Sequence, residues 1–386
     1  MMSSKQISLR VNRKRMHTMK TIQDPEVFRR RSMNFGALKR IMKKCVQILI
    51  TFGAMILLGS CIFPDPLGPP VEPWLCSINA DGTGFRKIKK VDLSFGTTGF
   101  WDIYMTKDNR IIFYGEKLWI SDPDDIHPIS ITDNIYRLQE NPARLSQSPD
   151  GSKLYFASRD KNIHELDLNT LLSRQLTDER VRTLRNPIVS DLGNYITYSS
   201  RGYGQPYYFS EYMYWHNLIT GESAIIPSPD TVAVNPSYSE IEDYVYYEKR
   251  GLFRSRLDGS DRSTVDDQGG SASPYTMFSI SRDHRYIVHN SNPSSTYFIR
   301  IFDKVNESGI DIPVKDYGAS ELMGVMCNDI NRIYYVSPGY PEKLWVRDLD
   351  SSESKILKPN NIEILGIYMI APTWDGSKVY FYAEIA

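Results

Sequence analysis

Histidine, cysteine and acidic side chains are the residues of this 386-residue chain that could bind a metal or move a proton. The six histidines show neither His-x-x-x-His spacing nor a cysteine partner at the spacing of a zinc site. His284 and His289 lie on either side of one predicted strand, so we expect them to face opposite ways or to lie far apart. The sequence therefore predicts no metal site and no cofactor.

Signatures of nucleophilic or calcium-dependent chemistry are also missing. The nearest run to Gly-x-Ser-x-Gly is Gly269–Ser273, which lacks the final glycine, and the sialidase-type Asp box is absent. Asn79–Gly84 matches only part of a calcium loop, and a hairpin turn explains it better. Carboxylates are numerous, so an acid–base pair stays open, because the sequence does not tell which of them face inward.

The charge of the chain is unevenly distributed. Lys+Arg and Asp+Glu number 46 each, yet residues 1–44 hold 13 basic and two acidic residues. Residues 61–386 therefore carry 33 basic against 44 acidic side chains. An acidic body without a clustered basic face argues against nucleic acid as a partner.

A turn followed by a short apolar strand recurs along the chain. Its members begin near 110, 153, 195, 244, 286, 332 and 378, at spacings of 42 to 49 residues. Seven further tight turns, such as Asp81-Gly82 and Asp258-Gly259, fall between them. Repeats of about 40–45 residues with four strands each are typical of a β-propeller. We therefore predict an all-β, seven-bladed propeller over 74–386, in four-stranded antiparallel blades.

The two ends of this region complete one blade. The first predicted hairpin, Trp74–Ile88, lacks the two inner strands of a four-stranded blade. The last, Pro372–Ile385, lacks the two outer strands. We expect the two to form the seventh blade together, which removes an exposed sheet edge. The same assignment places Cys76 and Cys327 too far apart for a disulfide, so we expect both to be reduced and buried.

The blade motif resembles that of a known family. Asn141–Phe156, with Ser-Pro-Asp-Gly at its centre, resembles the repeat of TolB-type (WD-like) propellers, and so do Ser77–Gly82 and Arg256–Ser260. TolB has an additional α/β domain, for which no room exists between Cys61 and Trp74. The resemblance therefore implies the blade architecture and a leaning toward protein binding, and not the role of TolB.

The loops between the second and third strands of the blades carry the candidate binding residues. The longest, in blade 3, contains Tyr, Gly and Pro, which is typical of interface hot spots. Blades 5 and 6 add residues to the same face. The predicted ligand- or partner-binding residues are Arg201, Tyr203, Tyr207, Tyr208, His289, Asn292 and Tyr340.

The segment before the propeller predicts export and lipid anchoring. Residues 45–60 are uncharged and follow Lys43 and Lys44, as in a signal peptide over 33–60. Leu58-Gly59-Ser60-Cys61 resembles a bacterial lipobox, which implies lipidation of Cys61. A plain signal peptide or an uncleaved anchor remain alternatives. Residues 61–73 are a Pro-rich linker, and 1–32 read as a non-native extension before a later start codon.

These features together predict a monomeric, lipid-anchored propeller of the bacterial cell envelope, on the outer membrane if two are present. Its predicted role is a non-enzymatic binding or scaffold module for a protein, peptide or glycan, with the lipid anchor as its sole membrane contact. The alternative is a propeller hydrolase or lyase acting on an envelope sugar or peptide through channel carboxylates. A narrow channel mouth with two or more converging buried acids, or a bound metal, would favour the enzyme, and a flat, aromatic, mostly unstrained face would favour the scaffold. A sugar-binding member of a polysaccharide system is a third possibility.

Overall fold

The computed structural model describes residues 72–90, 102–114, 117–132, 145–178, 183–201, 211–227, 234–249, 251–268, 278–294, 296–313, 324–327, 329–337, 341–360 and 362–385. All of them belong to the second of two compact units, Pro69–Ala386. Within these ranges no helix has the length and apolarity needed to span a membrane. The predicted signal peptide, Cys61 and nearly all of the linker lie outside the described residues.

The described chain consists of strands in seven four-stranded antiparallel sheets. Blades 1 and 2 are β3 (Asp102–Met105), β4 (Ile111–Tyr114), β5 (Leu118–Ser121), β6 (Ile129–Thr132), β7 (Ser146–Gln147), β8 (Lys153–Ala157), β9 (Ile163–Asp167) and β10 (Ser173–Gln175). Blades 3 and 4 are β11 (Thr183–Val189), β12 (Tyr195–Arg201), β13 (Glu211–Asn217), β14 (Ser223–Ile226), β15 (Val234–Ser239), β16 (Tyr244–Glu248), β17 (Leu252–Ser255) and β18 (Ser263–Asp266).

The remaining strands form blades 5, 6 and 7. Blades 5 and 6 are β19 (Phe278–Ile280), β20 (Tyr286–Ser294), β21 (Thr296–Asp303), β22 (Ser308–Pro313), β23 (Gly324–Met326), β24 (Arg332–Ser337), β25 (Lys343–Asp348) and β26 (Lys355–Leu357). Blade 7 combines β27 (Ile364–Pro372) and β28 (Lys378–Ile385) with β1 (Glu72–Asn79) and β2 (Arg86–Lys90). We call the four strands of a blade A to D, from the inside of the ring outward.

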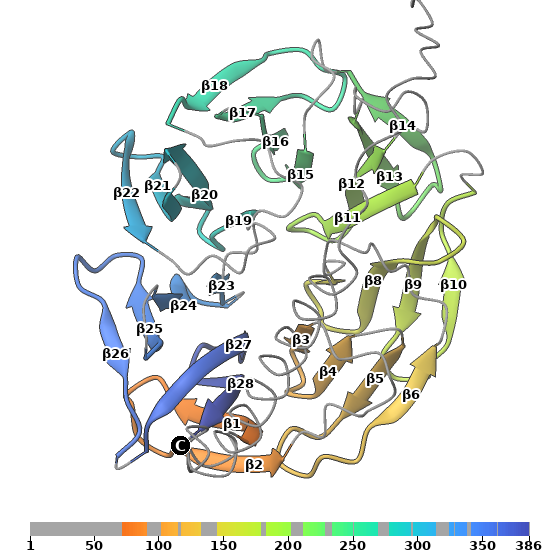
Figure 1. The fold of residues 1–386 in the computed structure, drawn as a ribbon. Helices are drawn as coiled ribbons and strands as arrows, with labels where there is room; N and C mark the ends of the chain where they lie inside the picture. The colour runs from red at the N-terminus through yellow and green to blue at the C-terminus, as the bar shows by residue number, and fades with distance from the viewer. Residues whose placement is uncertain are drawn as a thin grey trace, which may run out of the picture. The chain divides into compact units, whose positions relative to one another are not determined.

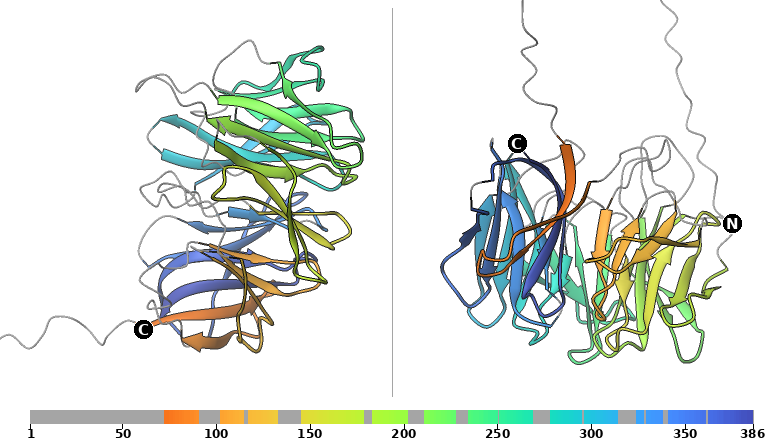
Figure 2. Two further views of the ribbon diagram at one scale, coloured as in Figure 1. Left: turned by 90° about the vertical axis from the view of Figure 1, so that its right-hand side faces the viewer. Right: turned by 90° about the horizontal axis from the view of Figure 1, so that it is seen from below.

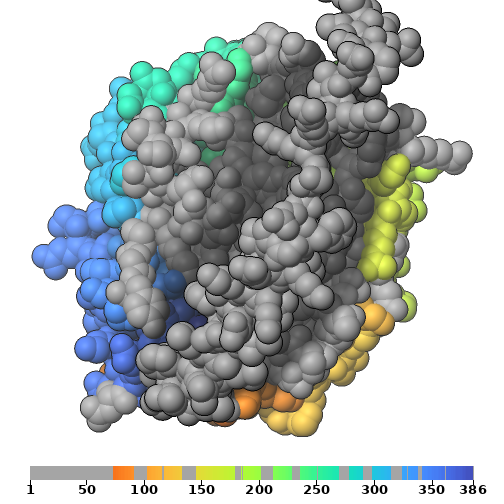
Figure 3. All heavy atoms as spheres, viewed as in Figure 1, coloured from red at the N-terminus to blue at the C-terminus, as the bar shows by residue number. Residues whose placement is uncertain are grey.

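The blades stand around a ring, with the A strands nearest the axis (Figure 1). Side views show the strands running between the two faces of the ring (Figure 2). In the space-filling view, described strands form the rim of one face (Figure 3). Up-and-down connectivity places the A–B and C–D turns at one face, the A–B end, and the B–C and D–A connections at the other, the B–C end.

The sequence explains the turns at the A–B end. Gly151, Gly193 and Gly376 have φ values of 83°, 83° and 61° in equivalent A–B turns. L-residues with a side chain rarely adopt this conformation, which is why glycine recurs there. In the same turns, the hydroxyl of Ser148 donates to Asp150 and that of Thr373 donates to Asp375. These short-range bonds stabilise the two turns locally.

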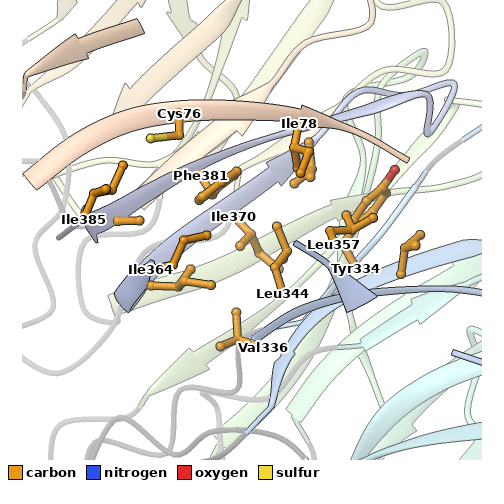
Figure 4. Close-up of a cluster of buried hydrophobic side chains, with 14 of the residues drawn as sticks. Cys76, Ile78, Tyr334, Val336, Leu344, Leu357, Ile364, Ile370, Phe381 and Ile385 are labelled. Carbon is orange, nitrogen blue, oxygen red and sulfur yellow. The ribbon is translucent and has the colours of Figure 1, made fainter. Parts of the chain in front are cut away.

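Blade 7 closes the ring as predicted. β1 pairs with β28 along its whole length, from Glu72 opposite Ile385 to Asn79 opposite Lys378. Side chains from both ends of the chain then share one core with blade 6 (Figure 4). Cys76 and Cys327 lie in this core as buried free thiols, which confirms the expectation for both. The predicted all-β, seven-bladed fold is confirmed.

Removing residues 375–386 should abolish folding of the ring, because β1 and β27 then lose the strand that joins them. We expect the truncated chain to elute as aggregate in size-exclusion chromatography and to lose a cooperative thermal transition. Removal of Ala386 alone, which follows β28, is the matched control. A soluble, compact truncated protein would contradict the closure described above.

Candidate functional site

Three of the seven sequence-predicted binding residues belong to the described part of the chain. Tyr203, Tyr207, Tyr208 and Tyr340 lie outside the described residues. Arg201 ends β12, and Asn292 and His289 both belong to β20, which continues through the segment expected to be a loop. His289 is fully buried. That these residues bind a partner stays a prediction, but the surroundings of His289 point to different chemistry.

His289 belongs to a row of four cross-strand partners in blade 5. Phe278 pairs with His289, His289 with Arg300, and Arg300 with Asp311. Directly paired residues point to the same face of a sheet, so these side chains form one stripe. The stripe faces blade 4, because Phe278 packs there against Leu252.

Blade 4 presents two carboxylates to this stripe. Glu248 pairs with Leu252, and Leu252 pairs with Asp266, near the B–C end of β16, β17 and β18. Glu248 and Asp266 are both only 5% exposed. Two buried acids thus lie on one face of one blade. We call Glu248, Asp266, His289, Arg300 and Asp311 the charged row.

The contacts across the two blades centre on Asp266. His289 Nε2 lies 3.4 Å from Asp266 Oδ2, and Arg300 Nε donates to the same oxygen. Arg300 Nη1 also donates to Asp311 Oδ1 at 3.0 Å. A Cβ atom at Gly309 would lie 2.5 Å from Arg300 Cζ, so the guanidinium rests where only glycine leaves space.

The electrostatics of the row favour the charged forms of Asp266 and Arg300. Burial raises the pKa of Asp266, but its interactions with His289 and Arg300 outweigh burial and hold that pKa below its usual range. Burial lowers the pKa of Arg300, but Asp266 and Asp311 together raise it above its usual value. A carboxylate, an imidazole and a guanidinium therefore share a largely dehydrated site, where their mutual interactions are strong.

The same position in the other blades is hydrophobic. Aligned on the A–B turns, the B-strand position of His289 is aromatic in all six other blades: Phe113, Phe156, Tyr198, Tyr247, Tyr335 and Phe381. In four blades this ring stacks on an aromatic C-strand partner, with centroids 5.5 to 6.2 Å apart. Blade 5 replaces the aromatic pair with His289 and Arg300, a departure that packing does not require.

A line of side-chain amides leads from the innermost strands to the row. Asn186 Nδ2 donates to Asn235 Oδ1 at 3.1 Å, and Asn235 Nδ2 donates to Glu248 Oε2 at 2.9 Å. Both asparagines sit at bulges in A strands, with φ of 47° and 55°. Non-glycine residues at positive φ, buried together, often mark functional sites.

A second titratable cluster lies at the A–B end of blades 3 to 5. His284 has φ of 59° at the turn position occupied elsewhere by glycine. Its Nε2 lies 3.3 Å from Asp191 Oδ2, and its Nδ1 lies 3.2 Å from the Ser239 hydroxyl, which donates to Asp191 at 2.7 Å. Because these groups bind each other across three blades, we assign the cluster a structural role in holding the three A–B turns together. His284 and His289 thus contact different residues.

Neither cluster is a metal centre in the described part of the chain, where no group of three His, Cys, Asp or Glu side chains could hold a metal ion. The residues that contact His289 were missed by sequence reasoning. The available signal was the alignment of the seven B strands, where His289 stands among aromatic residues.

Comparison with known proteins matches the fold alone. No family model and no curated protein matches this sequence. An oligogalacturonate lyase solved in complex with manganese is similar, with a TM-score of 0.54 and 13% identity over 74% of this chain and 89% of that chain. An oligogalacturonate lyase from Vibrio parahaemolyticus matches with a TM-score of 0.53 and 10% identity, over 82% of this chain and 92% of that chain. TolB from Acinetobacter baumannii matches with a TM-score of 0.47 and 13% identity, over 81% of this chain and 63% of that chain.

The prediction of a non-enzymatic binding or scaffold module is wrong. Two enzymes are among the solved propellers that the chain resembles, and this favours the alternative. Glu248 and Asp266 are both buried, and they lie on the face of blade 4 that packs on blade 5. Aromatic loop composition suggested a scaffold because it carries no information about the charged row.

Asp266 should make the fold sensitive to acid. A pKa lowered by folding stabilises the protein above the unfolded pKa of about 3.9, and this contribution is lost as the pH falls below that value. Replacing Asp266 with Asn should therefore lower the free energy of unfolding near neutral pH and flatten its decline below about pH 4. Urea unfolding across this range measures both.

The matched control is Asp125→Asn, because the Asp125 side chain is 79% exposed. We expect it to follow the wild-type pH dependence. If the free energy of unfolding of Asp266→Asn falls with decreasing pH as steeply as that of the wild type, the placement of Asp266 in the charged row is contradicted.

Proposed function

We propose that this chain is a propeller enzyme, a lyase or hydrolase that cleaves a glycan or peptide of the cell envelope with proton transfer supported by the charged row. The observation that carries the proposal is the replacement of an aromatic pair by His289 and Arg300 opposite Glu248 and Asp266. Proteins break their own packing rules mainly at functional sites.

The row offers the groups that such a reaction needs. Bond cleavage by elimination or hydrolysis requires one group to accept a proton and another to donate one. Carboxylates in different environments can divide these two roles between them. His289 and Asp266 are nearly fully buried, with side chains 1% and 4% exposed, so we assign them as positioning residues. Asp311, 37% exposed, connects the row to solvent.

Among the two cleavage modes, the fold supports a lyase first. The two similar enzymes act on oligogalacturonate, an acidic sugar chain. A lyase on such a chain removes the proton beside a sugar carboxylate, and fixed positive charge nearby stabilises the resulting anion. One of those lyases was solved with manganese, but the described residues here provide no metal-binding group, so the proposal includes no metal-dependent step.

The envelope location is supported by the sequence alone. The lipobox-like Leu58–Cys61 and the Pro-rich linker would hold the propeller at a membrane surface, where cell-envelope or captured polysaccharides are within reach.

Cleavage assays on acidic and neutral polysaccharides test this function. We expect new reducing ends, together with the short-wavelength ultraviolet absorbance of an unsaturated uronate product, when the protein acts on polygalacturonate. His289→Phe introduces the phenylalanine that blades 1, 2 and 7 have at this position, so we expect the variant to fold. Its cleavage rate should fall about 10²-fold or more. Because His289 acts through Asp266, the pH–rate profile should also change shape, with KM little altered.

His127→Phe is the control, since this side chain is 81% exposed and remote from the row in sequence and structure. Full activity of a folded His289→Phe protein would remove the charged row from the mechanism. Absence of cleavage on every acidic and neutral glycan and peptide tried would reject the enzyme itself.

A further inference from the structure

A pocket on blade 6 is lined by two buried donors that find no acceptor among the described residues. Its volume is about 620 Å³, and it lies beside β25, the following C–D turn and β26. Trp345, Arg347, Ser354 and Lys355 are among the residues that line it. Its turn residues belong to the A–B end of the ring, so the pocket is separate from the charged row at the B–C end of blades 4 and 5.

Arg347 is the exceptional residue of this pocket. Its side chain belongs to a residue only 7% exposed, and its Nε has no hydrogen-bond partner among the described residues. Trp345, two residues earlier on β25, has a buried Nε1 that also lacks a partner within the described ranges. Buried donors in proteins almost always find an acceptor, and a buried cation without one is costly.

The neighbouring cations are already engaged. Arg332 Nε donates to Asp348 Oδ1 at 2.6 Å, and its Nη1 donates to the Gly376 carbonyl at 2.7 Å. Lys355 Nζ donates to the Asp81 carbonyl at 2.6 Å. Among the described residues, Arg347 Nε is thus a lining donor that has no partner, and the pairing of Arg347 with Ile333 places its side chain against the apolar side of β24.

The surroundings also favour one type of ligand. The positive charge of Arg347 opposes the rise in the pKa of Tyr335 that burial causes, so it lies close to that ring, which stacks on Trp345 at 6.2 Å. Asp348 and Glu353 line the same pocket and would repel a polyanion such as a phosphate or sulfate cluster. Carboxylates and serine hydroxyls, in contrast, are good partners for sugar hydroxyls.

We propose that the blade 6 pocket binds the carboxylate of an acidic sugar, with Arg347 and Trp345 as donors. A planar carboxylate matches the fork of an arginine side chain, and the volume suits a ligand of one or two sugar rings. The site would hold an acidic glycan at a distance from the charged row. The inference does not rest on enzymatic activity, because it concerns binding alone.

Titration with galacturonate, galactose and sulfate tests the proposal. We expect galacturonate to raise the melting temperature and to shift the indole N–H resonance of Trp345 in a nitrogen-15 spectrum, while galactose and sulfate do neither. Arg347→Met should lose about tenfold or more in galacturonate affinity. Without ligand it should melt at the wild-type temperature or higher, because an unpaired buried charge is removed.

Lys343→Met is the matched control, since Lys343 is an exposed cation on the same strand and does not line the pocket. Unchanged galacturonate affinity of Arg347→Met, equal binding of galactose or sulfate, or no binding by the wild type would each overturn the proposal. An Arg347→Met protein that unfolds would do so as well, because it would show that Arg347 serves the fold. Binding in this assay and cleavage in the earlier one can succeed or fail separately.

Discussion

The pairing of β1 with β28 is the constraint on which the rest of the molecule depends. Eight residue pairs join segments from opposite ends of the described chain, and blade 7 does not exist without them. Each blade buries one face on the preceding blade and the other on the next, so a ring is the arrangement that leaves no apolar face exposed. Residues far apart in sequence, such as Trp374 and Met105, are then brought into hydrogen-bond contact at 3.0 Å.

Within that closed ring, most blade interfaces are held by the same packing. A B-strand aromatic residue stacks on a C-strand partner, and the pair fills the space toward the preceding blade. The interface between blades 4 and 5 instead contains ions near its B–C end. A buried ion pair rarely stabilises a fold more than well-packed apolar side chains would, so its presence is better explained by function than by stability.

Much of the fold was predictable because it repeats. Turn residues and apolar strands recur at 42 to 49 residues, and the two incomplete hairpins at the ends require each other. The charged row was not predicted, since His289 was assigned to a loop and its partners Asp266 and Arg300 are 23 and 11 residues away. Only the strand register shows that they share one face. The unpaired state of Arg347 likewise depends on three-dimensional contacts that no spacing encodes.

The most direct test of this account is to rebuild the blade 4 and 5 interface as the other blades have it. A triple variant with His289→Phe, Arg300→Tyr and Asp266→Ile would supply an aromatic pair and an apolar D-strand residue like Ile226 of blade 3. Thermal unfolding and polygalacturonate cleavage are measured together. We predict a folded protein at least as stable as the wild type and devoid of cleavage. A repaired protein that cleaves at the wild-type rate, or that no longer folds, would contradict the account.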